Sequence, residues 1–182
     1  MKVLVVFGTG EGQTRKVAGA IGETLRKNGL YATVVDASEH PPAASLFDAV
    51  IIGSAVHLQR YKPDITRYIK TNLCALNALP TAFFSVCMSI AADDPKLRQE
   101  ARNIADRYVA ELGWQPKQVG YFAGALKFTQ YGLLTKWIMK RISRREGHVT
   151  DTSHDYEYTD WVAVERFTRT FAEAAMHAMA LP

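Results

Sequence analysis

The feature that most constrains this chain is a short apolar strand followed at once by a glycine-rich turn and a helix. Residues Lys2–Phe7 form a run of β-branched and apolar residues typical of a buried strand. Three glycines follow between positions 8 and 12, and they let the backbone turn sharply and expose its N–H groups. From Gln13 the pattern is helical until Asn28-Gly29 ends it. Free amides and the positive end of the helix dipole meet at the turn, so we expect a phosphate to bind there.

The spacing of the glycines limits which phosphate-containing ligand the turn can bind. A Walker A loop ends in Gly-Lys-Ser/Thr, whereas this turn ends in Gly12-Gln13-Thr14, and Lys16 comes too late. A dinucleotide-binding turn, Gly-x-Gly-x-x-Gly, would require its third glycine at position 13, where this chain has Gln13. Asp36 does stand at the end of the next strand, where a ribose-binding acid belongs. The dinucleotide interpretation is therefore weakened but stays open.

The turn most resembles the flavodoxin phosphate loop, Thr-x-Thr-Gly-x-Thr, and reads Thr9-Gly10-Glu11-Gly12-Gln13-Thr14 in this chain. Flavodoxins bind FMN, so the resemblance implies FMN as the cofactor, with these six residues around its phosphate. Glu11 stands where the pattern usually has threonine. Because a carboxylate repels a phosphate, we expect only the Glu11 backbone N–H to contribute, with the side chain in solvent.

Strands and helices continue to alternate along the chain. Further strands are predicted at Ala32–Asp36, Asp48–Gly53, Ala82–Val86 and Val119–Ala123. Helices are predicted to open at Pro63 and Pro95 and after a Thr159-Asp160 cap, the last with Trp161, Val164, Phe167 and Phe171 on its apolar face. The pattern predicts an α/β fold with a doubly wound parallel sheet of five strands. The resemblance to flavodoxins implies the flavodoxin-like strand order 2-1-3-4-5. We expect a single domain over residues 1–182, with a long basic insert after strand 5 at about 125–158.

In this order the ligand crevice lies between strands 1 and 3, outside their carboxyl ends. Two further loops are then expected to flank the flavin ring. They contribute Ser54, Ala55, Val56 and His57 after strand 3 and Ser85, Val86, Cys87 and Met88 after strand 4. His57 and Tyr61 are the candidates to stack on the ring. The alternatives are a solvated loop histidine and a tyrosine packed against the following helix.

Composition excludes several classes of protein. With 182 residues, 48% of them hydrophobic, the chain can bury a full core. Its two cysteines, Cys74 and Cys87, form no CxxC pair, so we expect two packing residues and neither a disulfide nor a zinc site. No Ser-His-Asp arrangement, carboxylate pair or metal-ligand spacing is present. We therefore predict no catalytic side chain and no metal, with the chemistry on the flavin.

The charge of the chain differs from that of acidic electron-carrier flavodoxins. The formal net charge is +4, and a basic surface suits an anionic substrate or anionic lipid. No signal-peptide cleavage site and no apolar stretch of about 18 residues is present. We expect a cytoplasmic protein that can attach to the cytoplasmic face of the inner membrane.

The insert carries much of this basic character. Its middle is predicted to form an amphipathic helix, with an apolar arc of Leu134, Trp137, Ile138 and Ile142. Opposite this arc lie Lys136, Lys140 and Arg144. Arg141 falls within it and would have to snorkel. Such a helix suits a membrane surface or an anionic, partly apolar ligand. The alternative is a surface helix with solvated lysines. Nucleic acid is disfavoured because no nucleic-acid motif accompanies the charge.

Several short segments extend the resemblance beyond the fold. They are Glu11–Thr14, Phe47-Asp48, Val50–Gly53, Ala123–Lys127, Thr150–Thr152 and Tyr158–Trp161. In this order they resemble the bacterial flavodoxin-type protoporphyrinogen IX dehydrogenases, the quinone-dependent, oxygen-independent enzymes of haem synthesis. The resemblance implies FMN, a porphyrinogen donor, a menaquinone- or ubiquinone-type acceptor and an insert over the active site. Lys127, Lys136, Lys140 and Arg141 are the candidates for propionate or lipid contacts.

Three other functions remain compatible with the residues. The protein could be a flavodoxin-like electron carrier, which its basic charge disfavours. It could be an NAD(P)H:quinone reductase, although no nicotinamide site is marked. It could also be a flavin-free binding or membrane-adaptor module, which would purify colourless. The sequence predicts no particular oligomeric state.

Overall fold

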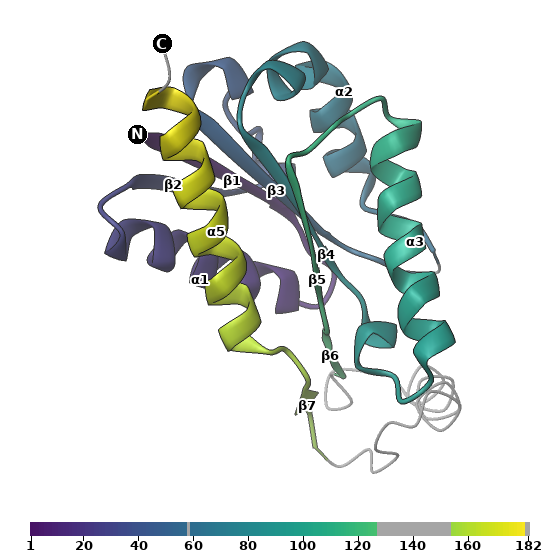
Figure 1. Ribbon diagram of the computed structural model, residues 1–182. Helices are drawn as coiled ribbons and strands as arrows, with labels where there is room; N and C mark the ends of the chain where they lie inside the picture. The colour runs from purple at the N-terminus through teal and green to yellow at the C-terminus, as the bar shows by residue number, and fades with distance from the viewer. Residues whose placement is uncertain (58, 127–153, 181–182) are drawn as a thin grey trace.

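A parallel sheet forms the centre of the computed structural model, which describes residues 1–57, 59–126 and 154–180 (Figure 1). Its five strands lie in the order β2-β1-β3-β4-β5, which confirms the predicted topology. The strands are β1 (Lys2–Gly8), β2 (Tyr31–Asp36), β3 (Ala49–Ala55), β4 (Thr81–Val86) and β5 (Gln118–Phe122). All neighbouring pairs are parallel. The chain order reverses beside β1, which places the switch point between β1 and β3.

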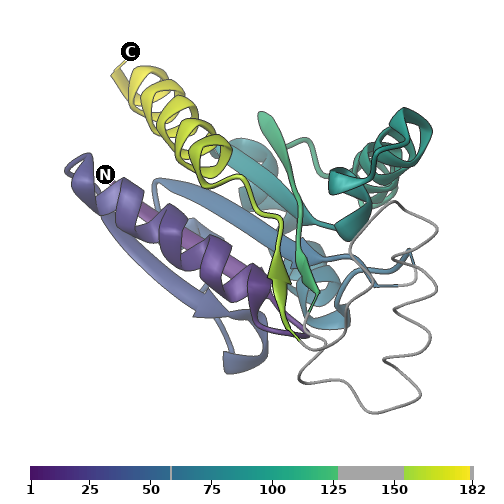
Figure 2. The same cartoon turned by 90° about the horizontal axis from the view of Figure 1, so that it is seen from below.

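Helices cover both faces of this sheet (Figure 2). One face carries α1 (Gln13–Lys27) and α5 (Trp161–Ala180), and the other carries α2 (Pro63–Ala78) and α3 (Pro95–Glu111). α2 and α3 each begin with proline, as predicted, because the missing N–H is not needed in the first turn. Short 3₁₀ turns complete the connections at η1 (Ala37–Glu39), η2 (Ala44–Leu46) and η3 (Met88–Ala91).

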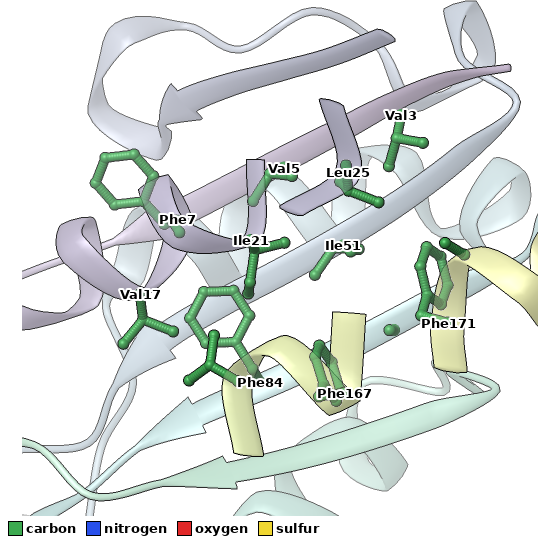
Figure 3. Close-up of a cluster of buried hydrophobic side chains, with 14 of the residues drawn as sticks. Val3, Val5, Phe7, Val17, Ile21, Leu25, Ile51, Phe84, Phe167 and Phe171 are labelled. Atoms are coloured by element: carbon green, nitrogen blue, oxygen red, sulfur yellow. The ribbon is translucent and has the colours of Figure 1, made fainter. Parts of the chain in front are cut away.

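The apolar stripe of α1 faces the sheet. Val17, Ile21 and Leu25 are fully buried, and Figure 3 shows them among side chains from β1, β3, β4 and α5. Phe167 and Phe171 of α5 belong to the same cluster. Burying each such side chain contributes about 1.5–3 kcal/mol. This packing holds the first turn of α1 rigidly against the end of β1.

Two expectations about packing were wrong. Trp161, predicted on the apolar face of α5, is 39% exposed, and its indole N–H donates to Glu157 Oε1 at 2.9 Å. Trp161 is the first residue of α5 and comes four residues after Glu157, the last residue of β7. Cys74, predicted as a packing residue, is exposed on α2, whereas Cys87 is half-buried, and both are free thiols.

A short antiparallel hairpin, which the sequence did not predict, joins the two ends of the insert. It pairs β6 (Ala125–Leu126) with β7 (Tyr156–Glu157). The predicted insert helix lies outside the described residues, as do Lys127, Lys136, Lys140 and Arg141. Among the helices that the structure describes, none combines the length and the apolar character needed to cross a membrane.

Candidate functional site

The glycine-rich turn lies at the carboxyl end of β1 and opens α1. Gly12 is the N-cap residue, with φ 87°, a left-handed conformation that favours glycine. Its N–H donates to Thr9 Oγ1 at 2.9 Å, which folds the turn back on itself. Among the described residues no side chain caps the helix, so the N–H groups of its first turn are left for an anion. The turn therefore has the form of the predicted phosphate loop.

The side chain of Gln13 is almost fully buried beneath this loop, at 5% exposure. Its Nε2 donates to Thr159 Oγ1 at 2.9 Å, and that hydroxyl donates to the Ala123 carbonyl at 2.7 Å. Because the hydroxyl proton is already used, the amide of Gln13 has to present its N–H to Thr159. Its Oε1 is then a buried acceptor with no donor among the described residues. A ligand hydroxyl group at the loop would satisfy it.

A second link joins α1 to the hairpin. Lys16 Nζ lies 2.7 Å from Glu157 Oε2, and the Trp161 indole occupies the other oxygen. Burial raises the pKa of Glu157, but the hydrogen bond and charge of Lys16 outweigh it and lower the pKa below its ordinary value. The base of the insert is thus tied to the phosphate loop through both Gln13 and Lys16.

Lys62 also reaches the phosphate loop, and the sequence did not reveal it. A Cβ atom on Gly10 would lie 3.4 Å from Lys62 Nζ, and one on Gly8 would lie 3.0 Å from Lys62 Cβ. The Lys62 backbone N–H also donates to Ser54 Oγ at 3.3 Å. The ammonium therefore adds positive charge beside the free amides. The position of Lys62, just before the helix that follows the third strand, is the feature of the sequence that could have indicated this role.

The three predicted segments meet at one edge of the sheet. The strand register places Gly8 beside Ser54 and Ser54 beside Ser85, with Ala55 beside Val86. All of these residues stand at the carboxyl ends of their strands. The fold therefore brings together the phosphate loop and both predicted ring-flanking loops.

The loop after β3 turns tightly. Val56 is half-buried and donates its N–H to the Val86 carbonyl at 2.9 Å. His57 and Arg60 exchange backbone hydrogen bonds of 3.0 Å in both directions, with Gln59 at φ 61° between them. The His57 side chain is exposed. This position is compatible with contact to a ligand and with the solvated alternative.

Tyr61 is placed by packing. It is 9% exposed, its ring lies 4.1 Å from that of Tyr108, and its hydroxyl shares a 2.9 Å hydrogen bond with Ser85 Oγ. Burial raises the pKa of Tyr61, so the phenol stays protonated. The packing partners of Tyr61 are therefore Tyr108 of α3 and Phe83 of β4, whereas the alternative named the following helix.

The loop after β4 begins with one more backbone hydrogen bond to β5. The Cys87 N–H donates to the Phe122 carbonyl at 3.0 Å, and Met88 then begins η3. Ser85, Val86, Cys87 and Met88 thus line the edge next to the loop after β3. Their contact with a flavin ring stays a prediction.

Asp36 bears on the dinucleotide interpretation. Its Oδ1 accepts hydrogen bonds from the Ser38 N–H at 3.1 Å and from Ser38 Oγ at 2.8 Å, and its Oδ2 lies 3.2 Å from Arg15. The carboxylate is therefore engaged in capping η1 and in an ion pair. These contacts give the carboxylate a structural role and disfavour the dinucleotide interpretation.

A parallel sheet in this order, with a phosphate loop at its switch point, defines a flavodoxin-like α/β protein. Residues 4–153 match the flavodoxin domain family. The chain belongs to that family, which indicates FMN as its cofactor and makes the protein a flavin oxidoreductase.

Two curated proteins similar to this chain share the same name. The chain is 30% identical over 173 residues to the protoporphyrinogen IX dehydrogenase [quinone] of Escherichia coli strain K12, covering 94% of this chain and 95% of that protein. It is 28% identical over 173 residues to the protein of that name from Leishmania major, covering 94% and 74%.

Solved structures support the fold. Oxidised flavodoxin 1 from Bacillus cereus matches with a TM-score of 0.56 and 17% identity, over 97% of this chain and 99% of that chain. A flavodoxin from the domain Archaea has the same TM-score and identity, over 97% and 100%.

The residues present fit FMN. The first-turn amides of α1 and the ammonium of Lys62 suit its phosphate. Oε1 of Gln13, which has no donor within the described part of the chain, suits a ribityl hydroxyl. Glu11 is exposed, as expected for a carboxylate beside a phosphate.

Proposed function

We propose that this protein oxidises protoporphyrinogen IX to protoporphyrin IX and passes the electrons to a menaquinone- or ubiquinone-type acceptor. The observation that carries the proposal is the match to the Escherichia coli relative, which spans nearly the whole length of both chains. The insert region lies within that match, so the likeness is broader than the shared fold.

The chain's own residues bind and orient. The first-turn amides of α1 and the Thr9 and Thr14 hydroxyls hold the phosphate, and the segments after β3 and β4 flank the ring. FMN, when bound, supplies the redox chemistry by accepting hydrogen equivalents from the porphyrinogen and releasing them to the quinone. The phenol of Tyr61 stays neutral and links the loop after β3 to β4 through its hydrogen bond with Ser85 Oγ.

The basic insert is the proposed contact for propionates or anionic lipid. Neutralising Lys136, Lys140 and Arg141 together is expected to lower porphyrinogen turnover or binding to anionic vesicles while FMN content stays intact. Retention of both activities in the triple variant would contradict the role proposed for the insert.

Anaerobic turnover tests the function directly. The FMN-loaded protein is given protoporphyrinogen IX with and without a menaquinone analogue, and the fluorescence of the porphyrin product is followed. Quinone-dependent fluorescence above a reaction without protein is the expected result. A yellow, flavin-replete protein that forms no product would overturn the proposal and favour electron carriage.

A further inference from the structure

A groove opens between the start of α2 and the second half of α3, on the sheet face opposite α1. Its volume is about 450 Å³, within the range of small-molecule sites. It borders the loop after β3, because Arg60 and Tyr61 belong both to that loop and to the groove lining. The groove is thus adjacent to the predicted flavin site and separate from the phosphate loop.

The walls of the groove are aromatic and well supported. Tyr61 and Tyr108 pack with ring centroids 4.1 Å apart and an interplanar angle of 31°. Each hydroxyl is anchored, that of Tyr61 on Ser85 and that of Tyr108 on Thr66, both at 2.9 Å. Ile104 adds a half-buried aliphatic surface. Such a wall is already formed for a flat, apolar ligand.

Two arginines stand at the opening. Arg60 is held at the end of the tight turn by its backbone bonds to His57, and Arg107 projects from α3. Both are exposed, and within the described part of the chain neither guanidinium forms an ion pair. Glu111 is the acid in the lining, against two arginines. Burial raises the pKa of both tyrosines, so they add no negative charge.

We propose that this groove binds the propionate-bearing edge of the porphyrin, with Arg60 and Arg107 on the carboxylates and the ring edge against the tyrosine wall. Guanidinium groups bind carboxylates through paired, charge-assisted hydrogen bonds and also stack on planar ligands. The inference rests on the proposed function for the identity of the ligand. It assigns substrate recognition to described residues that are distinct from the lysines of the insert.

Equilibrium binding of protoporphyrin IX, the stable oxidised product, to the FMN-loaded protein tests the groove. Arg60→Gln with Arg107→Gln is expected to weaken binding by about 30- to 100-fold, from about tenfold for each charge-assisted contact. The matched control is Arg67→Gln with Arg169→Gln, which removes the same charge from two exposed surface ion pairs. This control is expected to bind nearly as tightly as the wild type.

The dimethyl ester of protoporphyrin IX, which lacks free carboxylates, provides the second comparison. It is expected to bind the wild type and the Arg60/Arg107 variant equally. Undiminished protoporphyrin binding in that variant, an equal loss in the control variant, or no porphyrin binding by the wild type would each overturn the inference.

Turnover separates this inference from the proposed function. If the wild type oxidises porphyrinogen and the Arg60/Arg107 variant keeps its KM, the groove assignment fails and the function stands. If the wild type binds porphyrin but gives no product, and the Arg60/Arg107 variant alone loses that binding, the function fails and the groove assignment stands. FMN content and Tm, measured on every variant, are expected to match the wild type because both arginines are exposed.

Discussion

Lys62→Gln is expected to weaken FMN binding while leaving riboflavin binding nearly unchanged. The two ligands differ only in the phosphate, so their ratio isolates the interaction of the lysine with that group. The prediction depends on the position of the ammonium, 3.4 Å from where a Gly10 Cβ would lie, beside amides that have no capping side chain.

The size of the effect follows from charge and solvent exposure. Two unit charges about 5 Å apart attract by about 3 kcal/mol at an effective dielectric constant of about 20. Ordering the lysine side chain costs up to about 2 kcal/mol, and Lys62 is only half-buried, so solvent screens part of the attraction. A net of about 1 to 1.5 kcal/mol remains, which is about tenfold in Kd.

The assay is quenching of flavin fluorescence during titration of the apoprotein at low and high salt. Lys62→Arg is expected to retain most of the affinity. Lys70→Gln, which removes an exposed lysine from α2, the helix that Lys62 precedes, provides the matched control. The FMN preference of the wild type should also shrink as salt rises. Equal losses for FMN and riboflavin would refute the reasoning, because they would indicate a structural role for Lys62.

Three further substitutions test the architecture around the site. Gly53→Ala would place a Cβ 1.9 Å from Phe84 Cζ, so it is expected to destabilise the protein by about 1–3 kcal/mol in urea unfolding, with partial rescue by Phe84→Leu. Thr159→Val removes the acceptor for the buried Gln13 amide and should cost about 1–3 kcal/mol and weaken FMN binding, whereas Thr159→Ser should retain both. Glu157→Gln should lower stability at neutral pH by less than about 1 kcal/mol, since the pair is partly exposed. Because the folded pKa of Glu157 is lowered, this difference should vanish as the pH falls through that pKa, and a constant difference across the acid range would contradict the assignment.

Local patterns were enough to predict the sheet and the phosphate loop. The apolar runs of β1 and β3 are continuous because parallel strands are buried on both faces. The phosphate loop before Gln13 was predictable because all of its residues are neighbours in the sequence. The strand order 2-1-3-4-5 came from the resemblance to flavodoxins, since doubly wound sheets have more than one common order.

Contacts between distant residues were beyond the reach of those patterns. Lys62 reaches Gly10 only because β1 and β3 are neighbours in the sheet. The hairpin of β6 and β7 pairs two-residue strands, too short to show a period of two. For Tyr61 the sequence offered flavin stacking or packing against the following helix, but its ring packs against Tyr108 of α3, which is distant in the chain.

The hairpin has a consequence for how this chain tolerates change over evolution. Leu126 and Tyr156 are direct partners across it, so the two ends of the intervening sequence are held together at one point of the domain. Because closing a longer loop adds only about 0.6 kcal/mol per doubling of length, that segment can be lengthened, shortened or exchanged at little cost to the sheet. Substrate preference could therefore diversify among descendants of one flavin-binding scaffold without any need to rebuild the core that holds the cofactor.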